Sequence, residues 1–337
     1  MSVADKLYFT KENIERNRFN ASSVLAEQAV HCLELVAELA SSGLSFQFKG
    51  GNSLLIILGE PKRFSIDVDI ASDRPREEIE AALDKIVARF GTFTRWERRQ
   101  HKTKPWLPLS SYLLYYNGVF DTSPNAHVMF DVQMRRSPYK TEFKKVRCGN
   151  VYQADAKVEL PVPSSIIADK LLTLGPATLG IPIGRGKEAQ RLKHVYDVSR
   201  IAATLPDVAG MREVFHACLR QENDLQETCH TAAEVVKDTL SFLYTTAKLE
   251  EMPESSDIPA LSETIRGLEP FAGHLFDAGY DWRSLRRDMA RAALCISAVG
   301  NEKVTDEMLH KYISDAGATV GQLWDAVYAW WDGNIFW

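Results

Sequence analysis

The sequence predicts an α+β protein, in which a mixed sheet is followed by a mostly α-helical C-terminal region. Two observations lead to this fold class. Residues 92–120 and 127–134 alternate apolar and polar side chains and are rich in aromatic rings, which is typical of strands buried on one face. From residue 206 onward, apolar residues recur almost throughout at helical spacing. We therefore expect three segments: 1–160 with the sheet, a helical pair at 161–205, and a helical domain at 206–337.

Length and charge narrow the possible classes of protein. The 337 residues are enough for two ordinary domains, and a net charge of −5 gives no global basic field for nucleic acid. The charge is uneven, however: residues 91–150 hold eleven Lys and Arg against four Asp and Glu, and residues 221–270 hold three against eleven. A basic face in the first of these segments would attract a polyanion.

The sequence predicts a cytoplasmic protein without a membrane segment. The polar N-terminus is unlike a signal peptide, and no run approaches the ~20 apolar residues of a membrane span. The five cysteines form no CxxC pair, so we expect free, buried thiols in a reducing compartment. These cysteines are Cys32, Cys148, Cys218, Cys229 and Cys295.

Helix and strand signals place the elements in chain order. Ser22 or Ser23 suits a helix start and Gly43 a helix stop, and Pro75 suits the first turn of another helix. The same reading gives helices at 21–42, 52–58, 75–90, 164–175 and 188–205, strands at 46–48, 63–71 and 127–134, and later helices at 207–221, 226–249, 258–277, 282–299 and 304–333.

Two carboxylates mark the strand expected at 63–71. Asp67 and Asp69 are two residues apart, so they project from the same face of a strand. Adjacent carboxylates repel each other and need a compensating charge, for which a divalent hard cation such as Mg²⁺ is the usual partner.

A Gly-Gly turn lies just before this strand. Gly50 and Gly51 allow a backbone to approach a ligand, and they can leave N–H groups pointing at phosphate oxygens. Asn52 and Ser53 would then start a helix, whose N-terminus favours an anion. Together with Asp67 and the rest of its strand, the turn predicts a nucleoside triphosphate and magnesium site.

Asp131 is a lone acid among apolar residues of the strand at 127–134. Because a buried unpaired carboxylate is costly, we expect Asp131 to face the same metal site. The alternative is a pair with a neighbouring cation such as Arg135. The basic stretches at 95–104 and 135–147 either bind a nucleic-acid strand or form solvated faces.

Two charged residues lie inside the next two helices. Lys170 is surrounded by apolar neighbours, and Asp197 lies in a similar setting. A Lys near the acids would neutralise charge on a triphosphate, with Asp197 holding it in place. The alternative is a buried structural salt bridge.

The segments KGGNSL and RFSIDVDI resemble the AbiEii/AbiGii toxin family and its MenT-type relatives, which belong to the polymerase-β-like nucleotidyltransferases. The resemblance covers roughly residues 20–205. It implies that Asp131 is the third carboxylate and that Lys170 and Asp197 are the essential distal pair. Asn52 departs from the Thr or Ser that is usual in this family, and Lys193 and His194 depart from the usual flank.

The resemblance also implies a function. The chain would be the toxin of a toxin–antitoxin or phage-defence system, with a cognate antitoxin as partner. It would transfer a nucleoside monophosphate from an NTP to an RNA acceptor, a tRNA 3′ end, with Mg²⁺. Transfer to a protein or small-molecule hydroxyl, or a non-catalytic protein with a relic site, remain alternatives. The expected residues are Asp67, Asp69, Asp131, Lys170 and Asp197 for catalysis, the first three of these for the metal, and Gly50, Gly51, Asn52, Ser53, Arg63 and Ser65 for the nucleotide.

Overall fold

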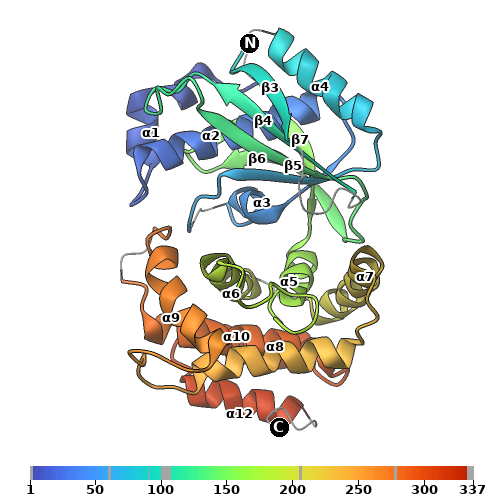
Figure 1. Cartoon of the computed structure of the whole chain (residues 1–337), viewed down its shortest axis with the longest axis vertical. Helices are drawn as coiled ribbons and strands as arrows, with labels where there is room; N and C mark the ends of the chain where they lie inside the picture. Colours follow the sequence, from blue (N-terminus) through green and yellow to red (C-terminus); the bar gives the residue numbers. More distant parts are fainter. Residues whose placement is uncertain are drawn as a thin grey trace. The chain divides into compact units, whose positions relative to one another are not determined.

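The computed structural model of the chain consists of two compact units (Figure 1). Within the described residues, all strands lie in the first unit and the second is helical, which confirms the expected order of sheet and helices. Apart from Pro161 and a short return segment near residue 275, the segments 161–205 and 206–337 fall in the second unit, so the separate roles expected for them stay predictions. The first unit contains Met1–Ser137, Thr141–Pro161 and His274–Asp277, and the second contains Pro138–Lys140, Val162–Gly273 and Ala278–Trp337. The structure describes residues 3–59, 62–89, 91–99, 108–204, 207–276 and 279–331.

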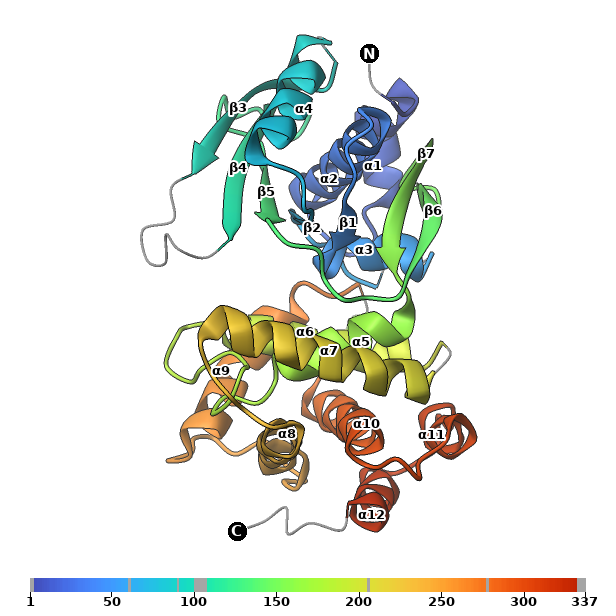
Figure 2. The same cartoon turned by 90° about the vertical axis from the view of Figure 1, so that its right-hand side faces the viewer.

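A seven-stranded mixed sheet forms the first unit, with the strand order β3-β4-β5-β2-β1-β7-β6 (Figure 2). β2 pairs in parallel with β5, and β1 pairs in parallel with β7, while the other neighbours are antiparallel. The strands are β1 (Gln47–Lys49), β2 (Asp67–Ala71), β3 (Phe93–Arg99), β4 (Leu109–Tyr116), β5 (His127–Gln133), β6 (Thr141–Cys148) and β7 (Tyr152–Pro161).

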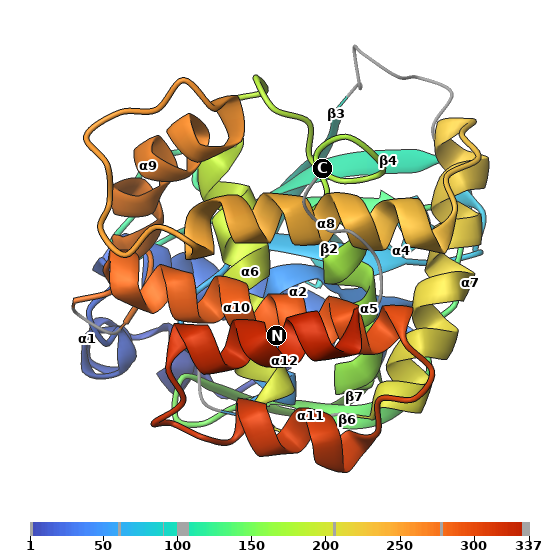
Figure 3. The same cartoon turned by 90° about the horizontal axis from the view of Figure 1, so that it is seen from below.

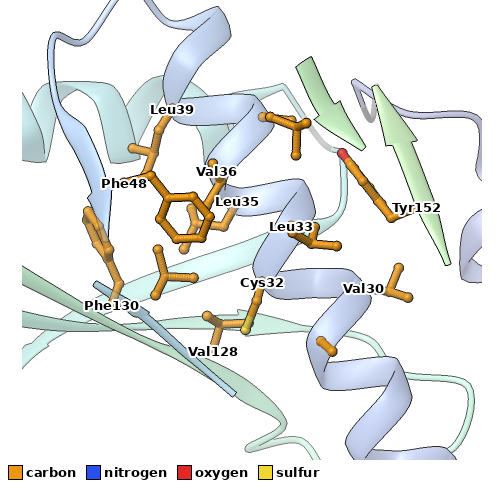
Figure 4. Packing of buried hydrophobic residues seen from close by; sticks show 14 of the residues in the cluster. Val30, Cys32, Leu33, Leu35, Val36, Leu39, Phe48, Val128, Phe130 and Tyr152 are labelled. Atoms are coloured by element: carbon orange, nitrogen blue, oxygen red, sulfur yellow. The ribbon is translucent and has the colours of Figure 1, made fainter. Parts of the chain in front are cut away.

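One face of this sheet is the core of the unit. Phe48, Val128 and Phe130 are fully buried, and they lie against the helix α2 (Ser23–Ser41) in Figure 4. The Ser22 side chain caps α2 by accepting from Leu25 N, as the sequence predicts. The remaining helical elements of this unit are η1 (Lys6–Phe9), α1 (Lys11–Asn17), α3 (Gly50–Ile57) and α4 (Arg76–Ala88).

The strand expected at 63–71 is shorter than predicted, because β2 begins only at Asp67. Arg63 forms instead an isolated bridge with Leu275, and Phe276 N donates to Lys62 O at 3.0 Å. The Phe276 ring stacks on Phe19 with centroids 4.7 Å apart. Leu275 and Phe276, from much later in the chain, therefore contact the residues that lead into β2.

The hairpin of β6 and β7 was not predicted from the sequence. Its two alternating runs meet at Gly149, which has a positive φ of 48° and turns the chain. Gly-Asn between alternating runs is the signal that would have revealed this hairpin.

The second unit is built from eight helices in the part of the chain that the structure describes (Figure 3). The single helix expected at 304–333 is two helices, because Thr319 starts the second one with a capping box. None of the described helices combines the length and hydropathy that crossing a bilayer requires. The helices are α5 (Pro163–Leu172), α6 (Glu188–Ala202), α7 (Val208–Gln226), α8 (Ala232–Ala247), α9 (Pro259–Ala272), α10 (Trp282–Gly300), α11 (Asp306–Ile313) and α12 (Val320–Trp330).

None of the five cysteines, which all lie among the described residues, forms a disulfide bond. Cys32, Cys148, Cys218 and Cys295 are buried as expected, whereas Cys229 is exposed. It follows the C-terminal end of α7, outside any buried helix face, and this explains the difference.

His31 of α2 predicts how stability depends on pH. Its ring is buried and stacks on Tyr116 at 3.7 Å, and its Nδ1 donates to Glu27 O at 2.8 Å. Burial lowers the pKa of His31 to about 4. Below the unfolded-state pKa of about 6.5, the unfolded chain binds a proton that the folded chain does not. The free energy of unfolding therefore decreases as the pH is lowered, by at most about 1.4 kcal/mol per pH unit.

We expect His31→Gln to reduce this slope between pH 6.5 and 5, while leaving the slope above pH 7 unchanged. Urea unfolding of both proteins at several pH values measures the difference, in which the other titrating groups cancel. Identical slopes would contradict the assignment.

Candidate active site

The acidic residues meet on the sheet face opposite the core. Asp69 of β2 lies directly opposite Asp131 of β5 in the parallel register, and Asp67 lies opposite Met129. Paired residues on neighbouring strands project from the same face, so all three carboxylates belong to one surface. Each is partly exposed, in contrast to the buried Val68 between the first two.

A row of polar residues crosses five neighbouring strands at this level. Asp69 pairs on its other side with Lys49 of β1, and Asp131 pairs with Ser111 of β4. Ser111 pairs in turn with Arg99 of the edge strand β3. We call Lys49, Asp69, Asp131, Ser111 and Arg99 the polar row. It has a cation at each end and two acids inside.

Hydrogen bonds fix parts of this row. The buried Ser111 hydroxyl donates to Asp131 Oδ1. Lys49 Nζ donates to Gln133 Oε1 at 3.1 Å and to Ser137 Oγ at 3.4 Å. Asp131 is therefore oriented from the β4 side, and the ammonium of Lys49 is held beside β5.

Gly50 and Gly51 form the first turn of α3, directly after β1. Gly50 has a φ of 72°, and a Cβ on it would lie 2.0 Å from Asp69 Oδ2. A Cβ on Gly51 would lie 2.8 Å from Ser65 Oγ and 3.0 Å from Arg63 Nη2. The turn thus adjoins Asp69 on one side and Arg63 and Ser65 on the other.

The side chains of Asn52 and Ser53 point into the protein. Both are fully buried: Asn52 Nδ2 donates to Asp67 O at 2.7 Å, and Ser53 Oγ donates to Gly50 O at 2.8 Å. Asn52 therefore ties the start of α3 to β2. The N-cap residue of α3, Lys49, makes no side-chain capping hydrogen bond. The N–H groups of a helix's first turn are in general suited to an anion.

Cys32 lies beneath the acids on α2 and is fully buried. Burial raises the pKa of its thiol well above the ordinary value, and the nearby carboxylates of Asp67 and Asp69 raise it further. The thiol therefore stays neutral and adds no charge to the acidic face.

The donor set of the acidic face is chemically suited to a hard cation. Carboxylate oxygens are what Mg²⁺ prefers, and this ion is usually held by one or two carboxylates together with substrate phosphates. Within the described residues, no three His, Cys, Asp or Glu side chains are grouped so that they enclose a metal by themselves. This holds for Asp67, Asp69 and Asp131 as well.

Lys170 and Asp197 pair with each other inside the second unit. Lys170 Nζ lies 2.9 Å from Asp197 Oδ2, and the two side chains are only 8% and 3% exposed. The sequence leaves open whether they serve catalysis or structure, and the observed ion pair is compatible with both.

Most cations of the stretch 135–147 have acidic partners. Arg136 pairs with Glu159, and both Lys145 and Arg147 pair with Asp155. In the stretch 95–104, the residues His101, Lys102 and Lys104 lie outside the described residues, as does the neighbouring Trp106.

Comparison with known proteins supplies the family. The model of the family described as nucleotidyl transferase AbiEii toxin, type IV toxin–antitoxin system, matches residues 34–288. The chain belongs to this family. A nucleotidyltransferase toxin of Mycobacterium tuberculosis H37Rv, MenT4, is a similar solved structure, with 15% identity, a TM-score of 0.48, and coverage of 83% of this chain and 98% of that one. A search of the curated proteins found no match.

The AbiEii protein is thus a nucleotidyltransferase toxin of a type IV toxin–antitoxin system, which implies a nucleotide substrate and an antitoxin partner. Nucleotidyltransferases of this family generally use a divalent metal ion. The sequence did not mark Lys49 or Ser111 as site residues, and it included Arg99 only as part of the basic stretch 95–104. Only the strand order brings these three residues into line with Asp69 and Asp131.

Gly50 offers a direct test of the site. In Gly50→Ala, the new methyl group would displace the Asp69 carboxylate, and the positive φ adds about 1–2 kcal/mol of strain. Gly43→Ala is the matched control, because Gly43 has a φ of 84° but a methyl group added there would meet nothing within 4 Å beyond its chain neighbours. We expect both variants to lose stability in urea unfolding and only Gly50→Ala to lose nucleotide binding. Equal nucleotide binding by the two would show that Asp69 is not positioned by this turn.

Proposed function

We propose that this AbiEii toxin transfers a nucleoside monophosphate from an NTP to an RNA acceptor in the cytoplasm, with Mg²⁺, and that the acceptor is a tRNA 3′ end. A role in phage defence belongs to the same proposal. The observation that carries it is the direct pairing of Asp69 with Asp131 beside the Gly50 turn. Family membership supports the reaction type, and the carboxylate donor set supports the metal.

Each residue has a place in the proposed reaction. Asp67, Asp69 and Asp131 would hold Mg²⁺, which when bound offsets the charge of the triphosphate. Asp131 accepts the proton of the acceptor hydroxyl, whose oxygen forms a bond to the α-phosphorus. The bond from this phosphorus to the bridging oxygen of the β-phosphate breaks, and pyrophosphate leaves.

The nucleotide is proposed to lie over the start of α3. The N–H groups of Gly50 and Gly51 face its phosphate oxygens, with Asn52 and Ser53 holding the turn from behind. Arg63 and Ser65 adjoin Gly51 and contact the nucleotide.

Lys170 and Asp197 have a proposed role at the same triphosphate. The Lys170 ammonium offsets charge on the departing phosphates. Asp197 orients this ammonium through the ion pair of 2.9 Å.

Labelling with each of the four α-³²P NTPs, Mg²⁺ and total tRNA tests the reaction. We expect wild type to label RNA with at least one NTP. Asp131→Asn should be slower by about 10²–10⁴-fold, because it removes the proton acceptor, and Asp67→Asn should also be strongly impaired. Asp73→Asn is the matched control, since Asp73 is exposed and lies beyond the end of β2. Label on protein instead of RNA, or an active Asp67→Asn, would refute the proposal.

A double substitution separates a catalytic from a structural role of the distal pair. Lys170→Met or Asp197→Leu alone removes one partner of a buried ion pair and should cost about 3–5 kcal/mol. The double variant removes both charges, so most of the stability should return in urea unfolding. We expect transfer activity to stay lost in the double variant. Recovery of activity together with stability would mean that the pair is only structural.

A further inference from the structure

Arg99 has an unusual position on the acidic face. It projects from the edge strand β3 on the same side as Asp131, and its Nη1 reaches across β4 to lie 3.0 Å from Met129 Sδ of β5. Met129 is the residue that pairs with Asp67. The guanidinium therefore points from the sheet edge toward the acids.

The partners that the protein offers to the Arg99 guanidinium are weak. Among the described residues, no carboxylate pairs with Arg99, and its hydrogen-bonding contact is a thioether, which is a weak acceptor. The nearest acid on its own strand is Glu97, which pairs with Arg95 and accepts from Tyr115 OH. An exposed guanidinium beside a phosphoryl-transfer site, with its acidic neighbour engaged elsewhere, is suited to bind a phosphate.

The strand order decides which phosphate it meets. The start of α3 lies beside Asp69, at the β1 and β2 end of the polar row, so the triphosphate occupies that end. Strands are spaced about 4.8 Å apart, which puts the Arg99 backbone about 10 Å from that of Asp131 and about 14 Å from that of Asp69. Arg99 is thus on the far side of the proton acceptor from the nucleotide.

We infer that Arg99 binds a backbone phosphate of the RNA acceptor and so directs its terminal hydroxyl to Asp131. The inference rests on the proposed function and extends it, because it assigns the β3–β4 side of the sheet to the acceptor. Arg99 is also better suited to bind an RNA phosphate than the basic stretch 135–147, because Arg136, Lys145 and Arg147 already pair with carboxylates.

The neighbouring Arg98 provides a matched control. It pairs with Tyr112 rather than Ser111, so it projects from the opposite face of the same strand. Both arginines are exposed, and replacement of either by Gln changes the net charge equally. Any difference in tRNA binding between Arg99→Gln and Arg98→Gln is therefore caused by the face of the sheet on which the arginine lies, and not by the net charge.

The test compares wild type, Arg99→Gln, Arg99→Lys and Arg98→Gln. Initial rates of labelling give separate KM values for total tRNA and for the NTP. Filter binding of labelled tRNA at several salt concentrations gives affinity without turnover. We expect Arg99→Gln to raise the KM for tRNA about tenfold and to lower the salt slope of binding by about 1, with the KM for NTP unchanged. Arg99→Lys should recover part of the loss, and Arg98→Gln should match wild type.

The outcomes separate this inference from the proposed function. Equal effects of Arg99→Gln and Arg98→Gln, or a rise in the KM for NTP instead of tRNA, would overturn the role of Arg99 while leaving the reaction intact. If wild type labels no RNA but binds tRNA through Arg99, the acceptor surface stands and the proposed reaction fails. Absence of tRNA binding by wild type would overturn the inference.

Discussion

Electrostatic repulsion between Asp69 and Asp131 is the constraint on which the rest of the active face depends. Like charges directly opposite each other in a sheet are destabilising, and the parallel pairing of β2 with β5 enforces this arrangement. The Ser111 hydroxyl, which donates to Asp131, and the cations at both ends of the polar row partly offset this repulsion. A divalent ion brought by a triphosphate would relieve the remaining repulsion, so stability and substrate binding are coupled at this point.

Local sequence was sufficient for the parts of this site that lie within one element. The two-residue spacing of Asp67 and Asp69 predicts a shared face, and the Gly50 turn needs a left-handed φ that Gly adopts without strain. The sequence also predicted that an acid isolated among apolar residues, Asp131, would lie near the pair. The order of sheet and helical region followed from the change in hydrophobic period.

The sequence did not predict which strands pair with each other across the sheet. Ser111 and Arg99 become neighbours of Asp131 only through the β3-β4-β5 order, and one residue of register shift would send both to the opposite face. Asn52 illustrates a different limit. Its place in the motif suggested contact with phosphate, but its amide fills the gap between α3 and β2 and bonds the backbone of Asp67. A motif gives the identity of a residue but not the direction of its side chain.

The return segment at residues 274–276 has a consequence for the order in which the first unit is completed during synthesis. It supplies the bridge to Arg63 and the Phe276 ring that packs on Phe19, although more than 200 residues separate it from Arg63. A ribosome that has completed every strand of the sheet has still not made the residues that fasten the loop leading into Asp67. A chain released early would carry the acids but lack these contacts, which can form only once translation has passed α9.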